Sequence, residues 1–177
     1  GRKPREMFGI AMQDLLGGRI AGTSWEELVR GALFAPLGMK RSNFSLKDLT
    51  ADPDHALGYQ LDEKRALIRD QYESAETMGP TGSINSSARE MTNYLRMMLA
   101  GGQYGGTRVL QAADVQAMMQ PNTPISPSNF PELAFGSYGM GLFVGAYRGI
   151  EFASHGGNMP GAAAQVLMVP REKLGIV

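Results

Sequence analysis

The chain has 177 residues, of which 43% are hydrophobic and 19% charged, values typical of a folded globular protein and not of a disordered one. Seventeen basic residues balance seventeen acidic ones without a Lys/Arg cluster, so we expect no nucleic-acid partner, and apolar runs such as 162–169 are too short to cross a bilayer. The lack of cysteine excludes disulfides and a thiolate nucleophile, and the two histidines lie too far apart for a zinc motif.

Helical signals dominate the beginning of the chain. Apolar residues recur at roughly helical spacing over residues 8–20. The segment 24–27 reads Ser-Trp-Glu-Glu, a capping box that predicts a helix, and Pro36 is expected to end it. The pattern then weakens, and we expect residues 41–79 to form loops with at most a short hairpin.

The clearest helix is predicted to start at Ser87, which opens a second capping box, and to stop at Gly101-Gly102. A shorter helix is expected over residues 112–119, followed by a proline-rich connector that suits neither a helix nor a central strand. The helix that starts at Ser87 carries one apolar stripe, formed by Met91, Tyr94, Leu95, Met98 and Leu99.

The last third of the chain has the pattern of strands. Extended segments are expected over residues 138–147, 150–154, 162–169 and from Leu174 onward, with a loop-like Gly/Pro segment at 155–161. Strands joined by short turns predict an antiparallel meander, and helices followed by strands predict the α+β class.

The last predicted strand has no visible end, and so we expect residues 1–177 to be the C-terminal fragment of one domain. In this interpretation residues 8–135 are mainly helices and loops, and residues 136–177 are antiparallel strands.

Four short motifs occur in one order: Pro-Leu-Gly-Met at 36–39, a Gly-rich turn with Ser-Ser-Ala-Arg-Glu-Met at 79–91, Tyr-Gly-Met-Gly at 138–141, and Ser-His-Gly-Gly-Asn-Met-Pro-Gly at 154–161. Together they resemble the serine β-lactamase and penicillin-binding protein family, which includes class C-like β-lactamases, D-Ala-D-Ala carboxypeptidases and esterases. The last motif is similar to the family's H-x-G variant of its Lys-Thr-Gly box.

The resemblance implies a penicillin-recognising fold and acyl transfer through a serine, with no metal or cofactor. It places His155 where a polar side chain contacts a substrate carboxylate or the proton relay, on an edge strand. It also implies that Gly156 and Gly157 let the strand approach the substrate, and that the backbone amide of Asn158 is one oxyanion-hole donor.

Two motifs of the family's active site are missing from the sequence. No Ser-x-x-Lys occurs, and the position of the Tyr-x-Asn motif falls on Arg5-Glu6-Met7. Ser83-Ile84-Asn85 is the one Ser-x-Asn triplet, but it lies where the family has a structural turn, and we assign it that role.

We therefore expect a fragment of a serine hydrolase whose nucleophile lies outside this segment and which is inactive alone. Its substrate would be a β-lactam, a D-amino-acid peptide or a small ester. The alternative is a non-catalytic β-lactamase-like binding or interaction module. Neither localisation nor oligomeric state follows from the sequence.

Overall fold

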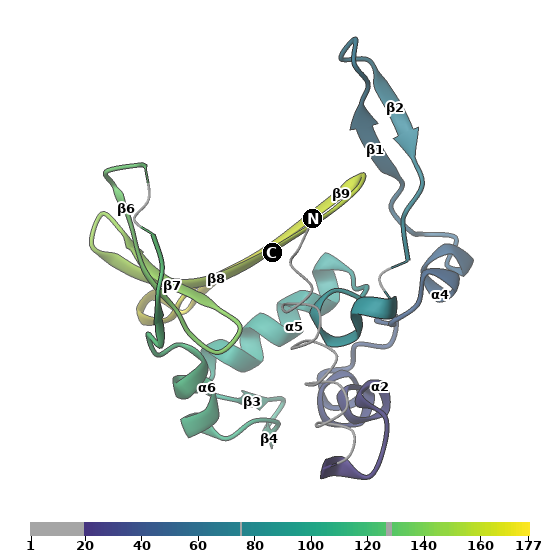
Figure 1. Ribbon diagram of the computed structural model, residues 1–177. Coiled ribbons are helices and arrows are strands. Elements are labelled where there is room, and N and C mark those ends of the chain that lie inside the picture. The colour runs from purple at the N-terminus through teal and green to yellow at the C-terminus, as the bar shows by residue number, and fades with distance from the viewer. Residues whose placement is uncertain (1–19, 75, 127–128) are drawn as a thin grey trace. The chain divides into compact units, whose positions relative to one another are not determined.

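A computed structural model describes residues 20–74, 76–126 and 129–177. It confirms the α+β class, with helices followed by an antiparallel sheet (Figure 1). The described residues form two compact units: the first runs up to Ser87 and includes Gly157–Ala163, and the second comprises Ala88–Gly156 and Ala164–Val177. The helix expected over residues 8–20 lies almost wholly outside the described residues.

Ser24 caps the first described helical segment, as half of the predicted capping box. The Ser24 hydroxyl accepts a hydrogen bond from the Glu27 amide at 3.2 Å, and α2 (Trp25–Val29) follows. The helix does not end at Pro36 as predicted. A π-helical turn, η1 (Arg30–Phe34), runs into α3 (Ala35–Leu37), and Gly38, at φ 66°, ends it. The wider turn accommodates a proline that lacks an amide hydrogen.

An aromatic cluster forms the core of the first unit. The ring of Phe44 stacks on that of Phe34, with 5.0 Å between centroids, and meets the edge of Trp25 at 4.9 Å. All three side chains are buried, as are those of Leu37 and Met39. The Pro-Leu-Gly-Met motif therefore contributes two buried side chains to this core, and its glycine ends the helix.

The segment 41–79 contains more regular structure than the sequence indicated. The short hairpin is confirmed as β1 (Gly58–Leu61) and β2 (Leu67–Asp70). The sequence analysis missed α4 (Leu46–Ala51), although its signal was visible, since the Ser45 hydroxyl caps it by accepting from the Asp48 amide at 3.0 Å. η2 (Glu76–Thr81) completes the segment.

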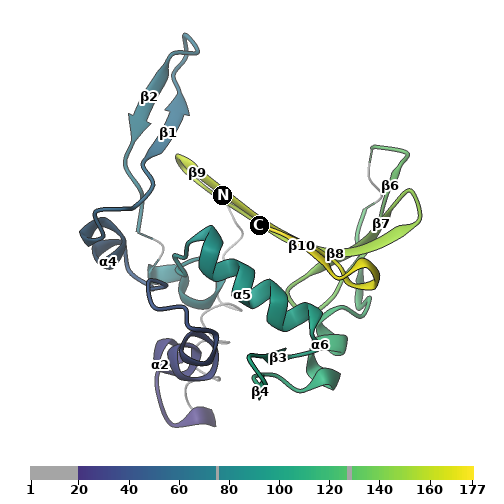
Figure 2. The ribbon, with the colours of Figure 1, turned by 180° about the vertical axis from the view of Figure 1, so that it is seen from behind.

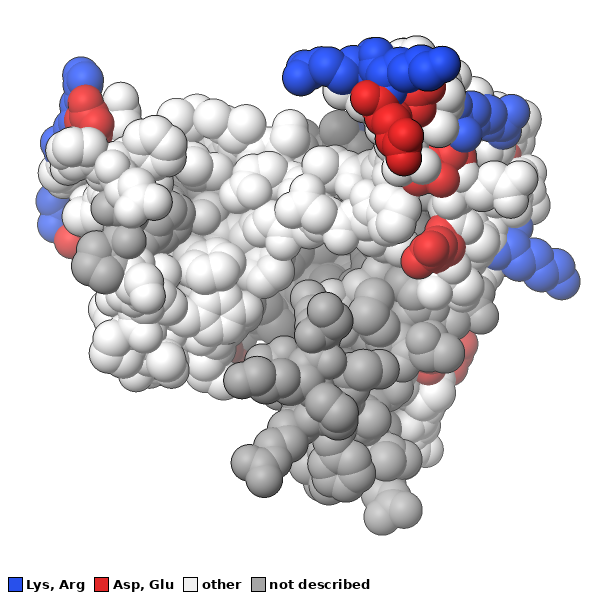
Figure 3. Space-filling view, turned by 45° about the horizontal axis from the view of Figure 1, so that its top comes forward, with Lys and Arg blue, Asp and Glu red and all other residues white. Residues whose placement is uncertain are grey.

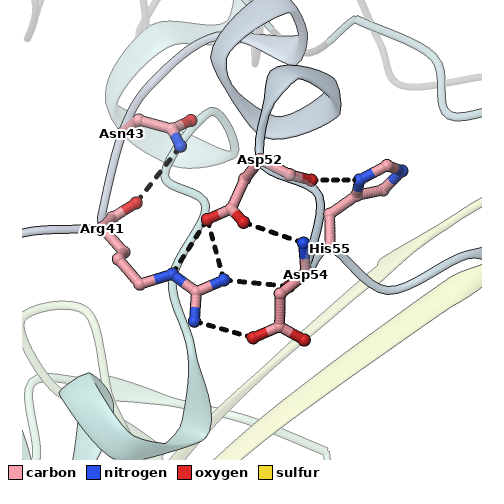
Figure 4. Close-up of polar contacts among 5 residues, drawn as sticks. All are labelled: Arg41, Asn43, Asp52, Asp54 and His55. Atoms are coloured by element: carbon pink, nitrogen blue, oxygen red, sulfur yellow. Dashed lines mark hydrogen bonds and ion pairs between the residues drawn. The ribbon is translucent and has the colours of Figure 1, made fainter.

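Arg41 holds the chain that leaves α4 (Figure 4). Its guanidinium contacts the Asp52 carboxylate at 2.7 Å, the Asp54 carboxylate at 3.0 Å and the Asp54 carbonyl oxygen at 2.9 Å. The Asp52 carboxylate also accepts from the Asp54 amide at 2.9 Å, and the His55 Nδ1 donates to the Asp52 carbonyl at 2.6 Å. The Asp54 amide and then Arg41 hold the pKa of Asp52 below its ordinary value, and the two carboxylates raise the pKa of Arg41.

The second unit begins with the predicted long helix, α5 (Ala88–Leu99). Leu95 and Met98 of the predicted stripe are buried, but so is Met97, which lies off that stripe and has no exposed surface. The helix therefore buries a wider face than the sequence pattern indicated. Gly101 and Gly102 end it with φ angles of 61° and 89°, as expected. The small hairpin β3 (Gln103–Tyr104) and β4 (Thr107–Arg108) and the predicted helix α6 (Ala112–Met118) follow.

A six-stranded antiparallel sheet has the order β10-β9-β8-β7-β6-β5, the predicted meander. Its strands in chain order are β5 (Thr123–Pro124), β6 (Leu133–Tyr138), β7 (Phe143–Tyr147), β8 (Ile150–Met159), β9 (Ala162–Val169) and β10 (Leu174–Ile176), with η3 (Pro170–Glu172) before the last.

Strand β10 lies against α5, and Figure 2 shows the two elements beside each other. A Cβ on Gly175 would come within 3.3 Å of the Leu95 side chain, so the strand and the helix are in close contact. Met168 and Phe152, from the neighbouring strands β9 and β8, are buried as well. The core of the second unit thus consists of α5 and the sheet.

We expect Asp52→Asn to remove a stabilisation that is present only above acidic pH. Because folding lowers the pKa of Asp52 from its ordinary value of 3.8, this stabilisation is complete above that value and is lost as the pH falls through the folded-state value. Urea unfolding at a series of pH values should show the largest gap between the wild type and D52N near neutrality and convergence in acid.

The matched control is Asp54→Asn, because the Asp54 side chain is 87% exposed and should contribute less. A gap between the wild type and D52N that persists or widens on acidification would contradict the role given to Arg41 and the Asp54 amide.

Candidate functional site

The four candidate site residues, His155, Gly156, Gly157 and Asn158, lie consecutively on strand β8. The loop-like segment predicted for residues 155–161 is wrong, because the strand continues to Met159 and the chain turns only at Pro160-Gly161. Glycines without a positive φ are compatible with an extended strand, whereas Gly161, at φ 76°, makes the turn. The extended conformation is the one that the family resemblance implied.

Strand β8 is twice as long as its neighbour β7, with ten residues against five. The ladder between them begins at Tyr147↔Ile150 and ends at Phe143↔Ser154. On the β7 side, the part of β8 from His155 to Met159 therefore lies beyond the last pair of that ladder. We call this stretch, residues 155–159, the β8 edge.

The His155 side chain is held at the start of the β8 edge by two aromatic residues. Its Nε2 lies 3.1 Å from the Tyr138 hydroxyl, and its ring lies over that of Phe143 with 5.8 Å between centroids and 28° between planes. Tyr138 and Phe143 meet edge to face at 4.8 Å. The register brings the three together, since Tyr138 pairs with Phe143, and Phe143 pairs with Ser154.

The turn between β6 and β7 fixes the position of Tyr138. The Gly139 amide donates to the Leu142 carbonyl at 2.7 Å, and the Met140 amide donates to the carbonyl of Met118 in α6 at 3.1 Å. A Cβ on Gly139 would overlap that same Met118 carbonyl, so the position requires glycine. The Tyr-Gly-Met-Gly motif is therefore a turn anchored to α6 with Tyr138 at its start. The single extended segment expected over residues 138–147 is wrong, because β6 ends at Tyr138 and β7 begins at Phe143.

The two glycines of the β8 edge have different surroundings. A Cβ on Gly156 would lie 2.5 Å from the Gln165 side-chain oxygen, so the space beside Gly156 holds a side chain of the neighbouring strand. A Cβ on Gly157 would have no heavy atom of the described residues within 4 Å. Of the two, Gly157 is the position where the strand borders open space.

The Ser83-Ile84-Asn85 triplet has the geometry of a structural element, as we assigned it. Asn85 exchanges both backbone hydrogen bonds with Asn43, at 2.9 and 3.1 Å. Its side-chain amide donates to the Asn43 side chain at 2.9 Å and to the Ser45 carbonyl at 3.3 Å. The amide that a catalytic triplet would present to substrate is thus used to join two segments of the first unit.

Several expectations concern sites other than β8. Arg5-Glu6-Met7, the position expected for Tyr-x-Asn, lies outside the described residues. Among the described residues, no group of three or more His, Asp or Glu side chains is placed to hold a metal ion, and no helix is long and apolar enough to cross a membrane.

On the face drawn in Figure 3, basic and acidic side chains occur together in small groups beside a largely uncharged surface.

Sequence reasoning missed the part that Tyr138 plays in the site. Its ring packs across strands against Phe143, and its hydroxyl is hydrogen-bonded to His155, a residue 17 positions further along the chain. The signal that could have found it is the Tyr-Gly-Met-Gly motif, which was identified for the resemblance but not linked to the histidine.

The comparisons with known proteins agree on one family. The family model described as Beta-lactamase matches residues 7–177. The chain is 25% identical over 172 residues to the unguisins hydrolase ungD of Aspergillus violaceofuscus, covering 89% of this chain and 30% of that protein.

Solved structures give the same result for the fold. The octameric penicillin-binding protein homologue from Pyrococcus abyssi matches with a TM-score of 0.79 and 24% identity, over 96% of this chain and 36% of that one. The D-amino acid amidase from Ochrobactrum anthropi SV3 matches with a TM-score of 0.65 and 21% identity, over 91% of this chain and 48% of that one. The chain thus spans between about a third and a half of these relatives.

The contrast between the two glycines predicts different effects of added methyl groups. Gly157→Ala should change the free energy of unfolding by less than about 0.5 kcal/mol, because its Cβ enters open space. Gly156→Ala should cost more, because Gln165 must move from its present position. Urea unfolding of both variants measures this, and a larger loss for G157A than for G156A would show that the space beside Gly157 is filled.

Proposed function

The chain belongs to the Beta-lactamase family, whose members are in general serine hydrolases, and on this premise we propose that it forms one wall of an acyl-serine hydrolase site. The proposed site acts on amide or ester bonds. Its nucleophilic serine lies outside the segment of 177 residues, because the sequence contains no Ser-x-x-Lys.

One observation supports this proposal above the others, namely that β8 extends beyond β7. The last pair of the ladder is Phe143↔Ser154, so the backbone of the β8 edge has no partner in β7. A strand edge with unpaired amides can donate hydrogen bonds to a ligand. The four candidate site residues, His155 to Asn158, all lie on this edge.

The proposed reaction gives each of the four candidate site residues a role. The serine oxygen adds to the substrate carbonyl carbon, its proton passes to a base of the missing segment, and the carbonyl oxygen becomes an oxyanion. The Asn158 backbone amide donates to that oxyanion together with the serine's own amide. Gly157 gives the substrate access to the strand, with Gly156 beside it, and His155 contacts the substrate next to the reacting bond.

The tetrahedral intermediate then collapses and expels an amine or an alcohol, which takes up the proton. Water hydrolyses the acyl-serine and releases the acid. No step needs a metal or a cofactor. An isolated oxyanion donor without the serine cannot start this sequence, so the segment by itself is inactive.

The substrate is a β-lactam, a D-amino-acid peptide or a small ester. One of the similar structures is named as a D-amino acid amidase, and that name denotes cleavage of an amide bond. Substrates with an amide bond are therefore the first class to test.

A second candidate is a non-catalytic binding or interaction module that keeps the fold without the reactive groups. The sequence favours it at one point, since Arg5-Glu6-Met7 occupies the position of the Tyr-x-Asn motif. The reading frame upstream of Gly1 separates the two candidates: a Ser-x-x-Lys motif there supports the hydrolase, and its absence supports the module.

Active-site labelling tests the proposal directly. The complete gene product should be labelled stoichiometrically on one serine by a fluorophosphonate or a fluorescent penicillin, and the segment of 177 residues should not be labelled. Nitrocefin and p-nitrophenyl esters should likewise be turned over only by the complete product.

Two results would count against it. Serine labelling of the 177-residue segment would place the nucleophile within it, and a complete product that has a Ser-x-x-Lys motif but takes no label would favour the binding module.

A further inference from the structure

We propose that Tyr138 is a positioning residue that holds His155 as the Nδ1–H tautomer, so that Nδ1–H becomes the donor offered to a substrate acceptor. The structural part of this inference concerns described residues of the second unit alone. Its catalytic consequence depends on the hydrolase function proposed above.

Tyr138 and His155 are in direct contact through their polar atoms. The Tyr138 hydroxyl lies 3.1 Å from His155 Nε2, within hydrogen-bond distance, and the two rings are inclined at 62°. The His155 imidazole is half-buried, and its Nδ1 has no hydrogen-bond partner among the described residues. One ring nitrogen is therefore occupied and the other is available.

The chemistry of the two groups decides which atom carries the proton in this hydrogen bond. A phenol hydroxyl donates strongly and accepts weakly, because its oxygen lone pair is delocalised into the ring, whereas an unprotonated imidazole nitrogen accepts strongly. The favoured arrangement has the Tyr138 O–H donating to Nε2. In a neutral imidazole the proton then resides on Nδ1, since the hydrogen bond made by one ring nitrogen sets the state of the other.

Packing holds the rings of Tyr138 and His155 in place. Phe143 lies over one face of the imidazole at 5.8 Å, and the same ring packs against Tyr138 at 4.8 Å. The hydroxyl is carried on the β6–β7 turn, which the Met140 amide attaches to the Met118 carbonyl of α6. Neither the His155 ring nor the Tyr138 ring can rotate away without disturbing the packing on Phe143. The orientation of the imidazole and its tautomer are therefore fixed together.

The consequence for the site is a specific kind of substrate contact. The Nδ1–H tautomer has a donor and no free acceptor, so His155 binds a carboxylate or carbonyl oxygen beside the reacting bond and does not remove a proton through Nδ1. A substrate with such an oxygen should be favoured over one that has a methylene group there.

Nitrogen NMR of the complete gene product tests the structural part. With ¹⁵N-labelled histidine, long-range ¹H–¹⁵N spectra should show His155 with a protonated Nδ1 and an unprotonated Nε2, the resonances being assigned by their loss in His155→Gln. Tyr138→Phe should shift His155 toward the Nε2–H form or a mixture. Tyr147→Phe, a half-exposed tyrosine of the same sheet, should leave the tautomer unchanged.

Acylation rates test the catalytic part. Y138F should be labelled by the fluorescent penicillin more slowly than the wild type, by the factor by which the NMR spectra show the Nδ1–H population of His155 to fall. His155→Asn places an amide nitrogen near the position of Nδ1, and His155→Gln places one near Nε2. H155N should therefore retain more activity than H155Q.

The outcomes distinguish the two claims. A proton on Nε2 in the wild type, or a tautomer that Y138F does not change, overturns the assignment of Tyr138. An Nδ1–H tautomer that depends on Tyr138 in a protein that no acylating probe labels leaves this assignment intact and rejects the hydrolase function. H155Q as active as H155N rejects the Nδ1 donor.

Discussion

The candidate site depends on a mismatch in length between two neighbouring strands. Strand β7 begins at Phe143, because the turn before it is attached to α6, while β8 runs on to Met159. An antiparallel ladder ends where the shorter strand ends, so the β8 edge keeps backbone groups that β7 does not pair. The same mismatch places His155, the first residue of this edge, beside the rings of Tyr138 and Phe143, which occupy the adjoining ends of β6 and β7.

Much of the fold could be predicted because the local signals agree with the tertiary structure. The capping serine at Ser24, the Gly101-Gly102 stop and the apolar run of residues 162–169 are local signals, and each coincides with a helix boundary or a strand of the structure. The failures have both local and tertiary causes. The helix continues through Pro36 because the π-helical turn before it accommodates the proline. Met97 is buried because α5 is covered on more than the one face that its apolar stripe defines.

The candidate site was less accessible to sequence reasoning. Its residues were found through the family resemblance, since a histidine beside two glycines reads locally as a loop, and that local prediction was wrong. The extended conformation depends on pairing with neighbouring strands, which no window of a few residues contains. The contact between Tyr138 and His155 depends on the register of three strands, and register is a property of the whole meander.

The central claim is that the β8 edge borders a reactive serine supplied by another part of the protein. The most direct test is a crystal structure of the complete gene product acylated by a penicillin or a fluorophosphonate. The account predicts that the Asn158 backbone nitrogen lies about 3 Å from the carbonyl or phosphonyl oxygen of the adduct, with Gly157 against the bound group. An Asn158 amide paired with another strand and remote from the adduct would contradict it.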